Sequence, residues 1–322
     1  MKTILVTGTA GFIGSNVAAQ LLKQQYNVIG VDNINDYYDT RIKIWRLERL
    51  KEQSEFVFYQ TDIENIDALR IIFQTHKPEA VINLAARAGV RYSMENPHIY
   101  LTTNAGGTLN LLDLCRELKV EKFVLASTSS LYAGQAMPFN EDLPVNTPIS
   151  PYAASKKAAE AIAYSYHYLY DIDVTVTRYF TVYGPAGRPD MSIFRFIKWI
   201  MEGKPLEVFG DGSQSRDFTF VDDIARGTIL ALKPVGYEVI NLGNNNPDTL
   251  SQAIQLIEKY VGGKATIEYR DFHKADIMAT WADINKAQNI LNWSPEIVLE
   301  EGIRRTVLWM KDNWDWVKDL NL

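Results

Sequence analysis

The chain has 322 residues, of which 47% are hydrophobic and 22% are charged, and its formal net charge at pH 7 is −6. This composition is that of a globular protein with a full apolar core, and the negative charge argues against a general nucleic-acid binder, which needs a basic face. A single cysteine, Cys115, allows no internal disulfide, and four scattered histidines indicate no metal site. No apolar run approaches the ~20 residues that span a membrane. We therefore expect a cytoplasmic protein without a membrane or a nucleic acid as partner.

The first half of the chain alternates short apolar runs with helical patterns. Strands are expected at 3–7, 27–31, 56–60, 80–84, 122–126 and 174–177. Helices are expected at 14–23, 66–75, 103–118 and 153–169. Strands that alternate with helices of this length indicate right-handed crossovers and a parallel sheet. The sequence therefore predicts an α/β fold, with a Rossmann doubly wound parallel sheet over residues 1–179.

The composition of the sequence changes after Arg178, where pairs of glycine and proline indicate loops between shorter elements. We expect residues 180–322 to form a smaller mixed α/β domain that binds the substrate and ends in an amphipathic helix. An apolar run at 238–242 predicts one more buried strand. The segment at about 217–245 is therefore expected to return to the first sheet.

Three glycines, Gly8, Gly11 and Gly14, lie between the first expected strand and the first expected helix. At this place the first allows a tight turn, the second lets backbone approach a pyrophosphate, and the third allows close packing of helix on strand. Asp32 ends the second expected strand, and its carboxylate can accept both ribose hydroxyls while repelling a 2′-phosphate. The alternative for Asp32 is a solvated turn acid. The sequence predicts NAD rather than NADP as cofactor, held by Gly8, Gly11, Phe12, Ile13, Gly14, Asp32 and Asn33.

A second pattern carries chemistry. Tyr152 and Lys156 are four residues apart, so they project from one face of the expected helix. A free tyrosine has a pKa near ~10 and is a poor base, but a neighbouring ammonium favours the phenolate. A hydroxyl of Thr128, Ser129 or Ser130 is expected to relay or hold the proton. Such a pair arises often by chance, and the glycine turn provides the context in which it predicts proton removal from an alcohol.

Two expected helices are too apolar for an exposed surface. The helix at 153–169 carries alanine, isoleucine and tyrosine on more than one face. A helix that is apolar nearly all round is buried on more than one side. With the helix at 103–118 it is expected to form a four-helix seam between two copies of the chain, hence a homodimer. The alternative is packing of both helices within one chain.

Eight segments together carry a resemblance to a known family. They are 7–14, 62–63, 83–86, 127–132, 152–156, 178–185, 187–191 and 210–219. Across essentially the whole chain they resemble the extended short-chain dehydrogenase/reductase family, and within it the nucleotide-sugar 4-epimerases. The sequence Arg-Pro-Asp-Met at 188–191, with Ala-Gly-Val-Arg at 88–91, most resembles the branch that acts on UDP-glucuronate. One residue inserted before the usual glycine at 131–134 is expected to alter the loop after Thr128.

This resemblance implies further site residues. Those implied to bind the cofactor are Asp62, Ile63, Leu84, Ala85, Ala86, Tyr152 and Lys156. Those implied to be catalytic are Thr128, Tyr152 and Lys156. Those implied to grip the UDP portion are Thr181, Phe209, Arg216 and Asp276. His273 departs from the family pattern, which often has Arg or Gln there, and Arg216 has the alternative of a structural ion pair with Asp217 or Asp222.

The resemblance implies an isomerase that converts UDP-glucuronate to UDP-galacturonate through a 4-keto sugar. This intermediate is a β-keto acid, which loses CO₂ when the bond to its carboxylate aligns with the carbonyl π-system. The side chains expected to hold the carboxylate away from that alignment are Thr128, Ser129, Ser130, Thr181 and Arg188. Further candidates for the sugar, expected on a loop after the fourth strand, are Arg91 and Ser93. The alternative for Arg188 is an exposed loop arginine.

Other functions compete with this interpretation. A UDP-glucuronate decarboxylase, which makes UDP-xylose, would share the first step without protecting the carboxylate. A UDP-glucose 4-epimerase is disfavoured by Arg188, and a dehydratase by Ser129-Ser130, where such enzymes usually have an acidic pair. A catalytically silent NAD-sensing regulator would keep the nucleotide fold, but the intact set of Thr128, Tyr152 and Lys156 argues against it.

Overall fold

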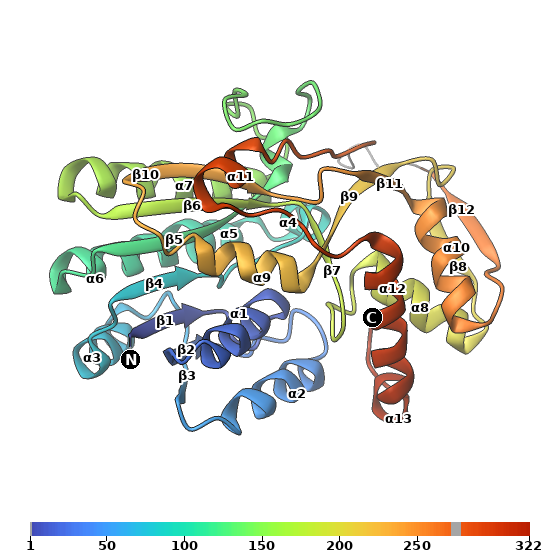
Figure 1. Ribbon diagram of the computed structural model, residues 1–322, viewed down its shortest axis with the longest axis horizontal. Helices are drawn as coiled ribbons and strands as arrows, with labels where there is room; N and C mark the ends of the chain where they lie inside the picture. The colour runs from blue at the N-terminus through green and yellow to red at the C-terminus, as the bar shows by residue number, and fades with distance from the viewer. Residues whose placement is uncertain (1, 272–277) are drawn as a thin grey trace.

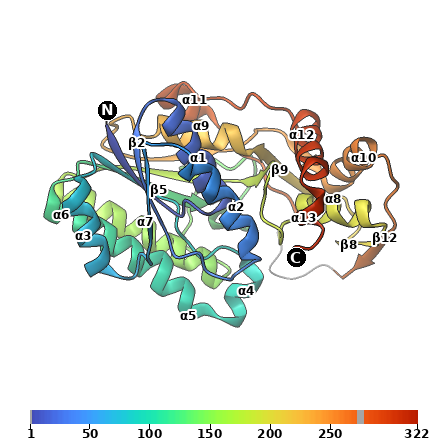
Figure 2. The same cartoon turned by 90° about the horizontal axis from the view of Figure 1, so that it is seen from below.

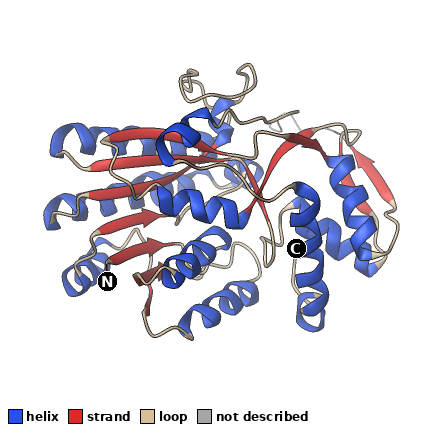
Figure 3. Ribbon diagram, viewed as in Figure 1, coloured by secondary structure: helices blue, strands red, loops and turns tan. Residues whose placement is uncertain are grey.

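A seven-stranded parallel sheet dominates the computed structural model of the protein, which describes residues 2–271 and 278–322 (Figures 1 and 3). In spatial order its strands are β10 (Tyr237–Leu242), β6 (Asp173–Tyr179), β5 (Lys122–Thr128), β4 (Ala80–Asn83), β1 (Thr3–Thr7), β2 (Asn27–Asp32) and β3 (Phe56–Gln60). All neighbouring pairs are parallel. The chain builds outward from β1 to β3 and then returns to add β4 on the other side, which is the doubly wound order. The predicted α/β fold is confirmed.

Helices cover both faces of this sheet (Figures 1 and 2). One face carries α1 (Phe12–Lys23), α2 (Thr40–Lys51), α9 (Val221–Leu230) and α11 (Asn285–Leu291). The other carries α3 (Ile66–His76), α6 (Thr108–Leu118) and α7 (Pro151–Tyr170). Because both faces are covered, every residue of β5 is buried, as parallel strands require. None of the helices in the described part of the chain has the length and apolar character needed to span a bilayer.

The predicted helix at 103–118 begins differently in the structure. Leu101–Gly107 forms a π-helical segment, and the α-helix α6 starts after it. Gly107 lies so close to Ile63 that an added Cβ would be 2.4 Å from the Ile63 Cδ1 atom. Wide π-turns occur often at functional sites. The absence of a side chain at Gly107 lets the backbone pack directly against Ile63, one of the residues predicted to hold the cofactor.

The rest of the chain forms a smaller mixed part, on the right of Figure 1. One sheet contains β7 (Thr181–Tyr183), β9 (Ser215–Phe220) and β11 (Pro247–Thr249), and β8 (Leu206–Phe209) pairs with β12 (Ile267–Arg270). The helices are α8 (Ser192–Glu202), α10 (Leu250–Val261), α12 (Leu299–Asp312) and α13 (Trp314–Val317). In the segment at 217–245, α9 packs on α1 and β10 joins the large sheet, whereas β9 lies in the smaller one. The division into domains at residue 179 stays a prediction.

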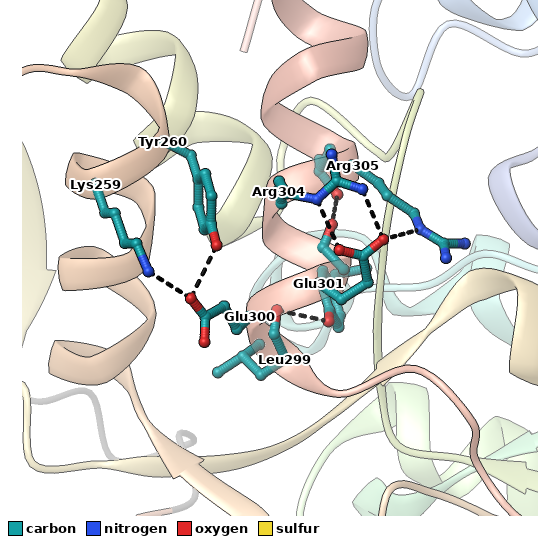
Figure 4. Close-up of polar contacts among 10 residues, drawn as sticks. Lys259, Tyr260, Leu299, Glu300, Glu301, Arg304 and Arg305 are labelled. Carbon is teal, nitrogen blue, oxygen red and sulfur yellow. Dashed lines mark hydrogen bonds and ion pairs between the residues drawn. The ribbon is translucent and has the colours of Figure 1, made fainter.

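Exposed ion pairs join α10 to α12 on the outer surface of the smaller part (Figure 4). The Glu300 carboxylate accepts hydrogen bonds from Lys259 Nζ at 2.6 Å and from the Tyr260 hydroxyl at 2.8 Å. Within α12, hydrogen bonds from Arg304 and Arg305 lower the pKa of Glu301 to about 2. Water screens such exposed pairs, so each contributes little to folding. The apolar packing between these helices carries most of their association.

A buried ion pair fixes α7 against the centre of the large sheet. The Glu160 carboxylate of α7 accepts two hydrogen bonds from the Arg178 guanidinium of β6, at 2.9 and 2.8 Å. The Ser127 hydroxyl of β5 donates to the same carboxylate at 2.6 Å, and Arg178 Nη1 donates to the Tyr132 hydroxyl at 2.7 Å. All four side chains are buried. The network therefore holds three adjacent elements in one register without access of water.

Removing one partner of this pair is expected to destabilise the protein strongly. In Glu160→Ala the Arg178 charge stays buried without its carboxylate, and we expect the free energy of unfolding to fall by about 3–5 kcal/mol. Urea unfolding measures this change. Glu300→Ala, which removes an exposed pair, is the matched control and should unfold like the wild type. Equal stability of Glu160→Ala and wild type would contradict the role of the buried pair.

Candidate active site

A cavity of about 830 Å³ runs along the carboxyl ends of the strands of the large sheet. One wall contains the glycine turn after β1 and the segments that follow β3, β4, β5 and β6. The opposite wall contains residues of α8, β8 and β9 from the smaller part. Open parallel sheets bind ligands at this edge, where the strand order reverses, and here β1 and β4 meet at that point. Nowhere in residues 2–271 and 278–322 do three or more His, Cys, Asp or Glu gather as metal ligands.

The glycine turn is held tightly by its own backbone and by Asp32. Gly8 has a φ of +73°, and its carbonyl oxygen accepts from Gly11 N at 2.9 Å. An added Cβ at Gly14 would lie 2.0 Å from that oxygen, so no other residue fits there. The Asp32 carboxylate accepts from Ala10 N at 3.0 Å and from Ile34 N at 2.8 Å. These bonds fix the turn at the N-terminus of α1, where backbone N–H groups favour an anion.

Two more polar groups shape the same wall. The Asn33 side-chain amide donates to the Asp62 carboxylate at 2.6 Å, which joins the ends of β2 and β3. The Thr7 hydroxyl accepts from Leu84 N at 3.1 Å and Ala85 N at 3.0 Å, which fixes the backbone after β4. The sequence analysis singled out Thr7 only as part of a motif. Its buried hydroxyl holds in place a segment predicted to line the nicotinamide ribose.

These residues fit a dinucleotide. The glycine turn offers N–H groups to a pyrophosphate, carboxylates stand where ribose hydroxyls need acceptors, and apolar side chains line the space between them. Every residue predicted to hold the cofactor lines the cavity: Gly8, Gly11, Phe12, Ile13, Gly14, Asp32, Asn33, Asp62, Ile63, Leu84, Ala85, Ala86, Tyr152 and Lys156. Their individual roles stay predictions.

The three residues predicted to be catalytic meet in this cavity. Thr128 ends β5, and its hydroxyl accepts from Ser130 N at 3.1 Å. Ser150 caps α7, so the helix begins at Pro151 and its first turn presents Tyr152. The Thr128 side chain lies close enough to the Tyr152 hydroxyl to lower its pKa. The phenol and the hydroxyl therefore face the same part of the cavity, where a proton can pass between them once a substrate is bound.

Lys156 is hydrogen-bonded to the neighbouring strand β5. Its ammonium is buried and donates to the Ala126 carbonyl oxygen at 2.9 Å, and burial lowers its pKa to about 8, opposed by Glu160. Burial raises the pKa of Tyr152, while the nearby Thr128 side chain and the positive charge of Arg188 lower it in part. Arg188 is therefore close enough for its charge to act on the phenol. The Ala126 carbonyl oxygen accepts from one of the three N–H groups of the Lys156 ammonium, and the expected action of Lys156 on Tyr152 stays a prediction.

Arg188 is not an exposed loop residue. Its guanidinium forms a two-pronged ion pair with Asp190, at 3.0 Å from Nε and 2.5 Å from Nη2. It also stacks over the rings of Tyr37 and Tyr38, at 5.5 and 6.0 Å from their centroids. The residue lines the cavity together with both tyrosines. A guanidinium carries five donors, of which Asp190 uses two and Tyr37 another, so Arg188 keeps donors that could bind an anion.

Not all residues predicted to bind the UDP portion can be placed in the cavity. Thr181, Phe209, Arg91 and Arg216 line the cavity with Ser129 and Ser130, and the Arg91 guanidinium lies 4.1 Å from the Phe209 ring centroid. Arg216 Nη1 donates to the Ser215 carbonyl oxygen at 2.8 Å. Asp217, the alternative partner of Arg216, accepts backbone N–H groups from Asn245 and Ala282 instead. Asp276 and His273 lie outside the described residues.

Ser93 is misplaced by the sequence analysis. The segment after β4 is a short helix, α4 (Val90–Glu95), rather than a loop. Ser93 is fully buried within it and its hydroxyl donates to the Val90 carbonyl oxygen at 2.6 Å. It does not line the cavity, whereas Arg91 and Tyr92 do. Successive side chains on a helix are rotated by about 100° about its axis. Arg91 and Ser93 are two residues apart, so their side chains point in nearly opposite directions and cannot both face the site.

Comparisons with known proteins bear on this cavity directly. The family model described as GDP-mannose 4,6 dehydratase matches residues 5–306. A UDP-glucuronate 4-epimerase of Thermodesulfobacterium geofontis is 60% identical over 100% of both chains. The chain belongs to this family. It is an extended short-chain dehydrogenase/reductase of the epimerase type, which confirms the resemblance described above.

Solved structures of the epimerase type superpose closely. The crystal structure of UDP-glucuronic acid 4-epimerase from Bacillus cereus, in complex with UDP-glucuronic acid and NAD, has a TM-score of 0.91 and 39% identity, covering 97% of this chain and 99% of that one. UDP-glucose 4-epimerase of Thermotoga maritima, with UDP-glucose, has a TM-score of 0.89 and 34% identity, covering 97% and 99%. Family membership thus extends to the whole fold, including the smaller part.

Several cavity residues of this family member escaped the sequence analysis. They are Tyr37, Tyr38, Lys43, Arg195 and Gln214. Tyr37 and Tyr38 follow the carboxyl end of β2, and their position after a parallel strand was an available signal. Burial lowers the pKa of Lys43 to about 8, opposed by Asp32. A lysine is usually solvated, and the residues around Lys43 in the sequence do not reveal that this one is buried.

Proposed function

We propose that the protein is an NAD-dependent UDP-glucuronate 4-epimerase, an isomerase that interconverts UDP-glucuronate and UDP-galacturonate. The observation that carries this proposal is the placement of Tyr152 and Thr128 in the same cavity as the glycine turn and Arg188. The 60% identity to a UDP-glucuronate 4-epimerase over the whole chain supports the same substrate and reaction. The B. cereus enzyme that superposes on this chain was crystallised with NAD and UDP-glucuronic acid, which supports the cofactor.

The residues of this chain would handle the proton of the reaction. Tyr152, as phenolate, would remove the proton from the 4-hydroxyl of the sugar, and Thr128 would share that proton. Bound NAD supplies a reversible hydride acceptor and donor, so the reaction has no net redox change. After the 4-keto sugar has turned about its diphosphate link, so that hydride would return to the opposite face of C4, Tyr152 would give the proton back to O4. Lys156 would hold the ribose from the floor of the cavity.

Carboxylate control is the second requirement. In the 4-keto sugar the bond between C5 and the carboxylate can break, with its electron pair moving to the C4 carbonyl as an enolate and CO₂ leaving. The enolate then takes a proton at C5. We propose that Thr128, Ser129, Ser130, Thr181 and Arg188 hold the carboxylate out of alignment with the π-system. Arg188 suits this role because Asp190 and the Tyr37 ring fix its plane.

We also propose that the enzyme is a cytoplasmic homodimer. Large apolar and aromatic side chains on α6 and α7 are exposed in the single chain, among them Tyr164, Tyr168 at 74% exposure, Leu169 and Leu109. These two helices lie together on one outer face (Figure 2). A two-fold axis there would bury the exposed side chains in a four-helix seam. Light scattering at micromolar concentration should give the mass of a dimer, and a monomer would contradict the seam; cell fractionation tests the compartment.

The catalytic assignment is tested by incubating the purified protein with UDP-glucuronate, without added cofactor, and identifying the sugar by NMR. We expect the C4-inverted product from wild type. Tyr152→Phe should lower turnover by about a hundredfold or more, because the proton has no acceptor, while NAD stays bound. Tyr170→Phe, at the exposed end of the same helix, is the matched control. Appreciable activity in Tyr152→Phe would contradict the assignment, and release of CO₂ by wild type would indicate a decarboxylase.

Substrate selection is tested at Arg188. In Arg188→Ala we expect the preference for UDP-glucuronate over UDP-glucose, measured as a ratio of kcat/KM, to fall by about tenfold or more, since a charge-assisted bond is lost. The fraction of substrate that loses CO₂ should rise in the same variant. Arg188→Lys keeps the charge without the fork and should lie between the two. An unchanged substrate profile in Arg188→Ala would remove this role.

A further inference from the structure

We propose that Arg46 is a positioning residue that fixes the turn carrying Arg188, and so limits the loss of CO₂ during the reaction. This inference rests on the proposed function. Arg46 belongs to α2, is 3% exposed, and uses every N–H of its guanidinium. Nε and Nη2 donate to the Ala186 carbonyl oxygen at 3.0 and 2.7 Å, and Nη2 also donates to Gly187 O at 3.0 Å. Nη1 donates to Ala10 O at 3.1 Å and to the Tyr38 hydroxyl at 2.8 Å.

The charge of Arg46 is buried without an acid beside it. Among the ion pairs of the described residues none includes Arg46, and its hydrogen-bond acceptors are three carbonyl oxygens and one hydroxyl. The rings of Phe12 and Tyr38 lie 5.8 and 5.6 Å from its guanidinium carbon. A buried cation compensated only by dipoles and rings is costly for folding. The role of Arg46 therefore lies in the groups that its guanidinium holds in place.

The guanidinium of Arg46 holds the backbone immediately before Arg188. Ala186 has a φ of +51°, a left-handed conformation that is unfavourable for a residue with a Cβ. The three hydrogen bonds to Ala186 and Gly187 stabilise this unusual turn from below. The fourth acceptor, Tyr38, is one of the two rings over which Arg188 stacks. Arg46 therefore fixes both the chain that leads into Arg188 and the surface on which its guanidinium rests.

The hydrogen bond from Arg46 to Ala10 reaches the part of the cavity that is predicted to bind the cofactor. Ala10 lies in the glycine turn, and its carbonyl oxygen accepts from Arg46, while its N–H donates to Asp32. One rigid guanidinium thus spans from the turn predicted to hold the NAD pyrophosphate to the turn predicted to hold the sugar carboxylate. The glycine turn has further bonds of its own, from Gly11 N and Ala10 N, whereas the Ala186–Gly187 turn depends on the fork. Loss of the fork should therefore disturb the sugar side more than the cofactor side.

Arg46→Lys tests this directly, since lysine keeps the charge but cannot make five bonds in one plane. We expect the ratio of the CO₂-loss product to the C4-inverted product to rise about tenfold, because small misplacements of a positioning group have effects of this size. Bound NAD per chain should change by less than about twofold. The ratio is taken within one sample, so partial unfolding does not alter it. Arg49→Lys, exposed on the same helix over Trp45, is the matched control and should behave like wild type.

Two further measurements separate positioning from a general structural effect. Arg46→Lys in the background of Arg188→Ala should add no further CO₂ loss, because Arg46 acts through Arg188. By calorimetry, Arg46→Lys should weaken binding of UDP-glucuronate about tenfold while leaving that of UDP nearly unchanged. An unchanged product ratio, an additive double variant, or equal weakening for UDP would overturn the inference. Absence of C4-inverted product from wild type would instead overturn the proposed function, and the calorimetric comparison would still decide the role of Arg46.

Discussion

The site depends on the buried pair of Glu160 and Arg178, because the reacting side chains come from a strand and a helix that must keep a fixed position relative to one another. Thr128 ends a strand, whereas Tyr152 and Lys156 lie in the first turns of a helix packed on the sheet. The pair joins that helix to β6, and the Ser127 hydroxyl next to Thr128 binds the same carboxylate. The position of the phenol relative to the hydroxyl is thus set from behind, by groups that water does not reach.

The same logic recurs around the cavity, where hydrogen bonds from polar side chains fix the wall that would hold the ligand. Thr7 fixes the backbone after β4, Asp32 fixes the glycine turn, and Asn33 joins the ends of β2 and β3. Each of these bonds crosses between neighbouring strands at their carboxyl ends. A parallel sheet brings those ends together, so a few short side chains suffice to build a rigid wall. The smaller part supplies the opposite wall through longer, charged side chains.

The sequence predicted the features that depend on neighbouring residues and missed those that depend on contacts between distant parts of the chain. Fully buried parallel strands are continuous apolar runs, so the strands and the glycine turn were found, although β5 extends to Thr128, two residues past the prediction at 122–126. Ser93 was misplaced because local sequence does not reveal the helix after β4. The hydrogen bond of Lys156 to the Ala126 carbonyl could not be predicted, because the acceptor is a backbone atom of a strand 30 residues away. The sequence did not reveal the role of Arg46, because its acceptor at Ala186 is a backbone atom 140 residues away.

Charge explains why this edge of an acidic protein accepts an anionic nucleotide. The chain as a whole is negative, yet Lys43, Arg46 and Arg188 gather around Tyr38, two of them lining the cavity. Mutual repulsion among these cations adds to burial in lowering the pKa of Lys43, with only Asp32 opposing it. The fold therefore holds cations close together at a cost to its own stability. A diphosphate or a carboxylate placed there relieves the repulsion, and that relief favours binding of a negatively charged ligand.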